Sequence, residues 1–420
     1  MKYFGTDGIR GVVGKDLSST LIKKVAKAIV LYYNKHKIKR VILVGNDSRQ
    51  SSDYILAILE TNLLKHGIRV ENLGLCSSPC LAYLTKKYNY PIGLMLSASH
   101  NPSEYNGLKF FNCFGEKVDD SFEKEFEGLM DKKTKLKTYY YEKEKCVEIL
   151  KQDYIHYLKK LKKFNFPVII DASNGGTSEI VKSVFSKQEK IHSKPNGLNI
   201  NKNCGCTNIE VLKSLCVKKQ KIGFALDGDG DRIHIVDKNV DVLTGDKIIH
   251  VLSKIFQKQG DICVGTVYSN TGLEIGLKER NIALKRSEVG DKKVYDLMKK
   301  NNSILGGEDS GHIILRHYMN TGDGIMNAII FANILQLSKL SIKELLANYS
   351  EYTQLRKNLP LTDCLSLESQ IIETIKNKYK DARIIIRPSG TEPILRVFVE
   401  HKEKYMAEKI LNEIMTVFTS

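Results

Sequence analysis

The residues best suited to chemistry form the string Asp227-Gly228-Asp229-Gly230-Asp231-Arg232, directly after the apolar run 222–226. Three carboxylates that pack together repel one another unless a cation lies among them, and the intervening glycines let the backbone fold tightly enough for all three to point inward. Oxygen ligands without thiol or imidazole favour Mg²⁺, Mn²⁺ or Ca²⁺ over zinc. An EF-hand loop is excluded, because the twelfth position counted from Asp227 is Lys238 and not a glutamate. The string predicts a site for a hard divalent cation; the alternative is a solvated acidic turn.

A second polar string, Ser97-Ala98-Ser99-His100-Asn101-Pro102, follows an apolar run that ends at Leu96. Loops at strand ends are where ligands bind in open α/β sheets. A serine there, accompanied by His100 and Lys109, can act as a nucleophile or carry a phosphate. An ordinary Ser/Asn turn closed by proline is the alternative.

Two further strings suit a phosphorylated sugar. Gly306-Gly307-Glu308-Asp309-Ser310-Gly311-His312 offers carboxylate, hydroxyl and imidazole groups to sugar hydroxyls, although a plain β-turn fits it equally well. Arg387-Pro388-Ser389-Gly390-Thr391-Glu392-Pro393, with Arg396 shortly after, combines arginine forks, hydroxyls and free N–H groups for a phosphate; the alternative is a loop with a surface arginine. Together the four strings describe one site, with a phosphorylatable serine, a divalent cation, a sugar contact and a phosphate anchor.

The segments that must position these strings alternate between helix and strand patterns. Ser18-Ser19-Thr20 offers N-caps for a helix over 21–35, and a second helix is predicted over 54–65. Short apolar runs predict strands at 41–44, 70–73, 92–96, 168–170, 222–226 and 262–264. This alternation is typical of α/β folds, and we expect parallel sheets covered by helices on both faces.

The pattern changes near residue 350. Strands are predicted at 383–387 and 394–399, on either side of a turn, and a helix follows to the end, which indicates a smaller α+β domain. The Lys/Tyr/Glu-rich segment 132–145 is the expected first domain boundary. A chain of 420 residues exceeds one ordinary hydrophobic core and predicts about two to four domains.

Composition limits the partners. The chain is 42% apolar and 27% charged, which is typical of a soluble globular protein. It has neither a run of about 18 apolar residues nor an apolar N-terminal signal, so we expect no membrane partner and a cytoplasmic location. The net charge of +17 comes from scattered lysines without an RNA-binding signature, which favours phosphate esters over nucleic acid. The nine cysteines form no zinc-like pairs, and we expect reduced thiols.

In their order and separations the four strings resemble the α-D-phosphohexomutase family, over essentially the whole chain. Within it, the string 4–11, the double serine in Ser97-Ala98-Ser99, Val289-Gly290-Asp291 and the string 321–324 are most similar to bacterial members that act on glucosamine phosphates. The resemblance implies an α/β fold with three related α/β domains and a smaller C-terminal α+β domain around a central cleft. The expected domains, each with one string, are 1–140 with the phosphoserine, 141–240 with the metal loop, 241–350 with the sugar loop and 351–420 with the phosphate loop.

The resemblance also implies roles for single residues. Ser99 is the phosphoserine, and Mg²⁺ is held by one of its phosphate oxygens together with Asp227, Asp229 and Asp231. The sugar is gripped by Glu308 and Ser310, with His312 and Arg232 nearby. The residues implied to bind the phosphate that does not react are Arg387, Ser389, Gly390, Thr391 and Arg396. Active-site positions are also matched by Arg10, His100 and Lys109, and Lys109 could transfer the hydroxyl proton if burial and neighbouring charge lower its pKa.

The implied reaction is the interconversion of glucosamine 6-phosphate and glucosamine 1-phosphate, toward UDP-N-acetylglucosamine and cell-wall precursors. It proceeds through phospho-Ser99 and a 1,6-bisphosphate that turns around in place, while the small fourth domain opens and closes. A hexosamine or hexose 1,6-bisphosphate would reload an enzyme that lost its phosphate, and the expected assembly is a monomer or a homodimer. The same mechanism on mannose or glucose phosphates is the alternative. Two departures keep it open: Asp309 stands where glutamine is more usual, and Gly230 stands where alanine is more usual.

Overall fold

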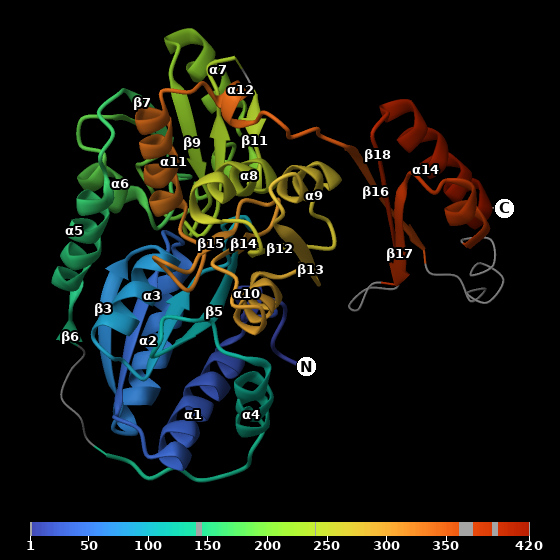
Figure 1. Cartoon of the computed structure of the whole chain (residues 1–420). Helices are drawn as coiled ribbons and strands as arrows, with labels where there is room; N and C mark the ends of the chain where they lie inside the picture. The colour runs from blue at the N-terminus through green and yellow to red at the C-terminus, as the bar shows by residue number, and fades with distance from the viewer. Residues whose placement is uncertain (1, 140–144, 240, 361–372, 389–393, 420) are drawn as a thin grey trace.

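The computed structural model describes residues 2–139, 145–239, 241–360, 373–388 and 394–419 (Figure 1). Within these residues the strands form sheets of six, five, four and three strands, which follow one another along the chain. Helices pack on the first three sheets, and the last sheet carries a helix at the C-terminus. This confirms the predicted α/β architecture of three larger units and a smaller α+β unit.

The first unit contains the sheet that carries the Ser99 string. Its strands, in spatial order, are β1 (Ile9–Val12), β5 (Tyr105–Asn112), β4 (Ile92–Leu96), β2 (Val41–Asn46), β3 (Arg69–Leu75) and β6 (Lys145–Cys146). Its helices are α1 (Ser19–His36), α2 (Ser51–Lys65), α3 (Ser78–Lys87) and α4 (Asp120–Met130). The predicted N-cap of the first helix is confirmed, because Ser18 accepts a hydrogen bond from the Leu21 backbone N–H.

The second unit carries the aspartate string. Its sheet has the order β11 (Val242–Leu243), β10 (Ile233–Val236), β9 (Ile222–Leu226), β7 (Val168–Asp171) and β8 (Glu189–Ile191). Its helices are α5 (Lys151–Leu161), α6 (Ser178–Val184) and α7 (Glu210–Lys219). Strand β6 lies beyond the predicted boundary at 140 but pairs with β3 of the first sheet. In the same way, β11 lies beyond the predicted boundary at 240 but pairs with β10 of the second sheet.

The third unit carries the sugar string. Its sheet has the order β13 (Ala283–Ser287), β12 (Ile262–Thr266), β14 (Leu305–Gly307) and β15 (Ile313–Leu315). Its chain also forms α8 (Gly245–Phe256), α9 (Thr271–Lys278), α10 (Asp291–Lys300), α11 (Gly324–Ser338) and α12 (Ile342–Leu345). Helix α11 is buried along most of its length and packs against α5, β9 and β10, so it joins the third unit to the second.

The predicted parallel pairing is confirmed only in part: β2 pairs in parallel with β3 and β4, β7 with β8 and β9, and β12 with β13 and β14. The pairs β4–β5, β9–β10 and β14–β15 are antiparallel. Each pair is joined by one of the polar strings, and so is the antiparallel pair of the fourth sheet, β17 (Arg383–Pro388) and β18 (Ile394–His401). A connection of this length can only turn back on itself, because parallel strands need a crossover of about a dozen residues or more. The first three strings are therefore hairpin loops, and the fourth string connects two antiparallel strands.

The fourth unit is a distinct body that contacts the third unit, where Arg383 donates to the Val267 and Ser269 carbonyls. Its sheet has the order β16 (Thr353–Pro360), β18 and β17, with α14 (Lys404–Thr419) on one face. Its core, which includes Leu359, Val397 and Ile410, is not continuous with the large core that links the first three units. In Figure 1 it stands to one side of the molecule. Among the described residues, no helix combines the length and the apolarity that a bilayer-spanning segment requires.

Candidate active site

Ser99 lies in the hairpin between β4 and β5 and faces the aspartate loop. Its side chain is buried, and its Oγ donates a hydrogen bond to Asp227 Oδ2 at 2.7 Å. The backbone of Ser99 has φ 52°, in the left-handed region that residues with a Cβ rarely adopt. The predicted phosphate carrier and the predicted cation site, 128 residues apart in sequence, therefore form one site.

The three aspartates of the β9–β10 hairpin converge as predicted. All three are buried, and one carboxylate oxygen from each lies within 4.8 Å of the others. Burial, with the charges of Asp231 and Asp229, raises the pKa of Asp227 to about 8. Asp229 Oδ1 and Asp231 Oδ1 are buried and have no hydrogen-bond partner in the described part of the chain. Orphaned carboxylate oxygens of this kind fit a divalent cation with oxygen ligands.

The glycines of this hairpin allow close approach. A Cβ on Gly228 would lie 2.5 Å from the Ser99 carbonyl oxygen, so the two loops touch through their backbones. Gly230 has φ +76°, and a Cβ there would lie 2.3 Å from a methyl group of Thr177. In this chain Thr177 occupies the space that an alanine would need. The glycine at position 230 is therefore required by the local packing.

Lysines neutralise the acids of the site. Lys109 Nζ lies 2.6 Å from Asp229 Oδ2 and 2.9 Å from Asp7 Oδ2, and its side chain is buried. Burial acts to lower the pKa of Lys109, but Asp229, Asp7 and Asp231 outweigh it and raise that pKa above its usual value. The lowered pKa on which proton transfer by Lys109 depended is therefore not found, because these carboxylates hold the proton on the lysine.

His100 and Arg10 border the same site. Burial, together with the charges of Arg232 and Arg10, lowers the pKa of His100 to about 4. At neutral pH the imidazole of His100 is therefore uncharged and able to accept a proton. Arg10 forms an ion pair with Asp7, which also binds Lys109.

Sequence reasoning assigned no role to four residues that complete this charge network. Lys117 Nζ lies 2.6 Å from Asp7 Oδ1 and forms a close ion pair with Asp291, while Ser78 Oγ donates to Asp229 Oδ2. Asp7 and Asp291 lie in strings that were used only to support the family resemblance. Their position in those strings could have indicated a role in the site. Lys117 and Ser78 lie in no such string, and only the tertiary structure reveals them.

The sugar string contributes groups at the edge of this network. His312 lies 3.6 Å from both Asp231 and Asp291, and its Nε2 accepts the Gly322 N–H at 3.1 Å. Glu308 Oε1 accepts the Gly290 N–H at 2.9 Å. Ser310 Oγ is buried and has no partner in the described residues, so its hydroxyl is available to a ligand. Arg232 donates its backbone N–H to Asp227 Oδ1 at 3.1 Å. Three of the four strings thus meet.

The fourth string lies on the separate C-terminal unit. Ser389, Gly390 and Thr391 are outside the described residues, so their predicted role cannot be placed. Arg387 and Arg396 face each other on β17 and β18, an arrangement of like charges that destabilises a sheet and favours an anion between them. Arg387 Nη2 lies 3.5 Å from the hydroxyl of Tyr268 in the third unit. The contacts of Arg387 among the described residues are with Tyr268 of the third unit and not with Ser99 or the aspartates.

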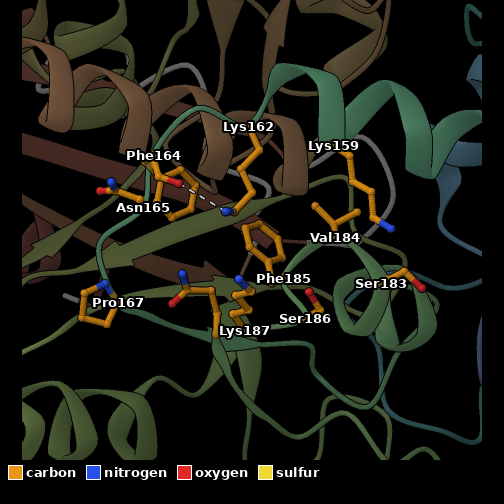
Figure 2. Close-up of a pocket in the computed structure, with 11 residues that line it drawn as sticks. Lys159, Lys162, Phe164, Asn165, Pro167, Ser183, Val184, Phe185, Ser186 and Lys187 are labelled. Atoms are coloured by element: carbon orange, nitrogen blue, oxygen red, sulfur yellow. Dashed lines mark hydrogen bonds between the residues drawn. The ribbon is translucent and has the colours of Figure 1, made fainter.

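Two other features lie apart from this site. A cavity of about 590 Å³ opens where α5 and α6 end (Figure 2). None of the predicted residues lines it, and its Lys162 donates to the Phe164 carbonyl. The side chains of Asp171, His192 and Cys204 also cluster, but both oxygens of Asp171 accept hydrogen bonds, from the Ser173 and Gly205 backbone N–H groups and from His192. We therefore assign the active site to the three hairpins.

Comparisons with known proteins agree with this geometry. Family models match residues 1–137 ("Phosphoglucomutase/phosphomannomutase, alpha/beta/alpha domain I"), 244–352 (domain III of the same name) and 341–417 (its C-terminal domain). The chain is 36% identical to the phosphoglucosamine mutase of Shouchella clausii, covering 99% of this chain and 98% of that one. It is 37% identical to the phosphoglucosamine mutase of Dictyoglomus turgidum, covering 98% and 97%.

Solved structures show the same fold. A phosphoglucomutase/phosphomannomutase family protein from Burkholderia thailandensis superposes with a TM-score of 0.79 at 19% identity, covering 98% of this chain and 96% of that one. The Aspergillus fumigatus N-acetylphosphoglucosamine mutase, solved with GlcNAc-6P and magnesium, gives a TM-score of 0.66 at 17% identity, covering 98% and 94%. With relatives above one-third identity along its whole length, the chain belongs to the phosphoglucomutase/phosphomannomutase family, the α-D-phosphohexomutases.

Proposed function

We propose that the chain is a phosphoglucosamine mutase, which interconverts glucosamine 6-phosphate and glucosamine 1-phosphate through a phosphoserine and a 1,6-bisphosphate. The observation that carries the proposal is the buried contact between Ser99 Oγ and Asp227 within the cluster of three aspartates. The full-length likeness to phosphoglucosamine mutases supports the choice of sugar.

The aspartates would hold Mg²⁺ together with an oxygen of phospho-Ser99. The cation would neutralise the charge of the transferring phosphoryl group. Two orphaned oxygens, on Asp229 and Asp231, and the exclusively oxygen donor set support this assignment.

The protein's own cations and hydrogen-bonding groups would stabilise charge, accept the substrate proton and bind the sugar. Lys109 stays an ammonium group, and it would stabilise the charge of the transferring group instead of removing the substrate proton. His100 is uncharged at neutral pH, so it would have a ring nitrogen able to accept the proton, which the Lys109 ammonium group lacks. Glu308 and Ser310 would bind sugar hydroxyls and place the reacting oxygen in line with Ser99.

Arg387 and Arg396, with the loop 389–393, would bind the phosphate at the far end of the sugar. The fourth unit would have to close on the other three to deliver these arginines, and its separate core is compatible with rotation as a body. Closure would exclude water from phospho-Ser99, and opening would give the bisphosphate room to turn.

The deciding experiment compares kcat/KM for the 6-phosphates of glucosamine, mannose and glucose, with a glucose 1,6-bisphosphate primer and Mg²⁺. We expect glucosamine 6-phosphate to be preferred by at least about tenfold, which is the ratio set by about 1.4 kcal/mol in the transition state. A preference for mannose or glucose phosphate would assign the chain to the alternative activity with the same chemistry. The Ser99→Ala variant is the blank for contaminating mutases.

A further inference from the structure

The side chain of Arg49 hydrogen-bonds to the backbone of the loop that carries Ser99. It follows β2 and has a fully buried side chain. Its guanidinium donates to the carbonyl oxygens of Ser99 at 2.9 Å, Asn101 at 2.8 Å and Tyr105 at 2.9 Å, and also to that of Pro102. One side chain therefore fixes carbonyl groups along the whole hairpin that carries Ser99.

The charge of Arg49 is neutralised locally. Its Nε lies 3.0 Å from Asp47 Oδ2, an oxygen that also accepts a hydrogen bond from Ser97 Oγ at 2.6 Å. Ser97 Oγ in turn accepts the Ser99 backbone N–H at 2.9 Å. The guanidinium thus binds the backbone of Ser99, and an ion pair with Asp47 stabilises its charge in a buried site.

Asn201 supplies a second hold on the same loop, from the second unit. Its Nδ2 donates to the Ser99 carbonyl at 2.8 Å and to the Asn101 carbonyl at 3.1 Å. Two of the four carbonyls that bind Arg49, those of Ser99 and Asn101, therefore also bind a residue of the unit that carries the aspartates. The residues beside Arg49 reinforce this junction, since Ser48 Oγ donates to the Asn174 carbonyl at 2.5 Å and the Gln50 N–H donates to the Gly197 carbonyl at 3.0 Å.

These contacts bear directly on where the Ser99 hydroxyl points. Ser99 has φ 52°, a conformation that persists in a residue with a Cβ only where the surroundings impose it. The direction of its carbonyl group and the position of its Cβ are set by the same backbone angles. Donors that fix the carbonyl from both units therefore also fix the line from Ser99 Oγ to Asp227.

We propose that Arg49 and Asn201 are positioning residues for phosphoryl transfer, which clamp the Ser99 and Asn101 carbonyls and so aim Ser99 Oγ at the aspartate cluster. The proposal rests on the proposed function and adds to it two residues that need not touch the substrate. Loss of either clamp would leave the chemistry in place but misdirect the phosphoryl group.

The test is a single-turnover measurement on Arg49→Lys. The variant keeps a cation for Asp47 and loses the planar fork that reaches several carbonyls. Each protein is loaded with glucose 1,6-bisphosphate, its phospho-Ser99 fraction is measured by intact mass, and transfer to glucosamine 6-phosphate is followed by rapid quench. We expect the rate constant to fall about 100-fold, as for a misplacement of about 1 Å, with an amplitude that still equals the phosphorylated fraction. A merely structural role would lower the amplitude and the melting temperature and leave the rate constant unchanged.

Arg40→Lys is the matched control, because Arg40 also donates to backbone carbonyls, those of His66 and Gly67, at the opposite end of β2. We expect its rate constant to equal that of the wild type. Should Arg49→Lys not fold, Asn201→Ala removes the second clamp from a partly exposed position, and we expect about a tenfold slower transfer. Rate constants within twofold of wild type for the folded variants would overturn the positioning proposal. A wild type that is loaded but transfers to no hexose or hexosamine phosphate would instead overturn the proposed function.

Discussion

The three hairpins around Ser99 and the arginine-bearing sheet of the fourth unit are built in opposite ways. Around Ser99 the charged groups are buried and paired with one another, as Lys109 is with Asp229 and Asp7. On the fourth sheet Arg387 is half-buried and contacts Tyr268 of the third unit. The guanidinium carbon of Arg387 lies 5.9 Å from the centroid of the Tyr268 ring. The first region shares a core with its neighbours, whereas the fourth unit has its own.

This difference separates two tasks. Phosphoryl transfer depends on charges held in place before the substrate arrives, because reorganisation during reaction raises the barrier. A phosphate anchor that must serve either end of a bisphosphate has to release and rebind its ligand, so it belongs on a part that moves. Changes near Ser99 should therefore reduce kcat, and changes in the fourth unit should mainly raise KM.

The largest effect should follow loss of an aspartate. In Asp229→Asn a proposed metal ligand is weakened and Lys109 loses its nearest carboxylate. We expect kcat to fall about 10³-fold or more, at the upper end for loss of one preorganised group. Steady-state kinetics at saturating Mg²⁺ measures this. Asp237→Asn, in the turn after β10, is the control and should change kcat by less than twofold. A drop confined to KM would contradict the division of tasks.

A steric change in the same hairpin should have the next largest effect. In Gly228→Ala the new Cβ would lie 2.5 Å from the Ser99 carbonyl oxygen, so the two loops must separate. We expect kcat to fall about 100-fold, because phosphoryl transfer tolerates little misalignment. Gly128→Ala, on the exposed side of α4 with no atom within 4 Å of the new Cβ, is the control. It should leave kcat unchanged and stabilise the protein slightly, by up to about 1 kcal/mol in thermal unfolding.

A change in the anchor should affect binding. Arg387→Lys removes a planar fork for phosphate, and we expect KM for the sugar phosphate to rise about tenfold with kcat within twofold. Lys402→Ala, in the turn after β18, keeps the fourth unit intact and is the control. A large loss of kcat with unchanged KM would mean that the fourth unit takes part in the chemistry itself.

The smallest effect concerns the joint between the third and fourth units. Buried Glu400 accepts hydrogen bonds from the Thr271 backbone and hydroxyl and pairs with Arg383 at 2.7 Å. Burial opposes ionisation of Glu400, but the bonds from Arg383, Gln354 and Thr271 prevail and lower its pKa below the ordinary value of 4.5. Of these bonds, only the two from Thr271 come from the third unit, so ionised Glu400 stabilises the docked state through them. That contribution is present above the ordinary pKa and is lost as pH falls through the lowered one.

We therefore expect the docking of the fourth unit to stay constant from neutral pH down to about 4.5 and to weaken below it. Small-angle scattering at a series of pH values measures the change. Glu400→Gln should weaken docking at neutral pH by about 1–3 kcal/mol and remove the pH dependence. An identical pH profile in this variant would show that another group controls the joint.

Much of this organisation was predictable from local patterns. The runs 92–96 and 222–226 are strands with those bounds, and Ser18 is the N-cap of α1 as expected. The convergence of Asp227, Asp229 and Asp231 was expected because glycines alternate with them, and the repulsion among three carboxylates indicated a cation. The hairpin connections of the first three strings were missed, because strand direction depends on pairing between strands and the apolar runs do not encode it.

The site residues that could be predicted are those that lie next to one another in the four polar strings of the sequence. Lys117 and Arg49 contact residues that are distant in the sequence. The residues next to them in the sequence do not indicate these contacts. The pKa of Lys109 was expected to fall on burial, but it rises because three carboxylates from other segments surround it. Such properties belong to the assembled charge network and could not be derived from spacing.

The most direct test of the whole account is the intact mass of the protein after incubation with glucose 1,6-bisphosphate and Mg²⁺. We predict one added phosphate on the wild type, located on Ser99 by peptide mapping, and none on Ser99→Ala. A wild type that takes up no phosphate, or a Ser99→Ala variant that takes up as much as the wild type, would contradict the claim that Ser99 carries the transferred group.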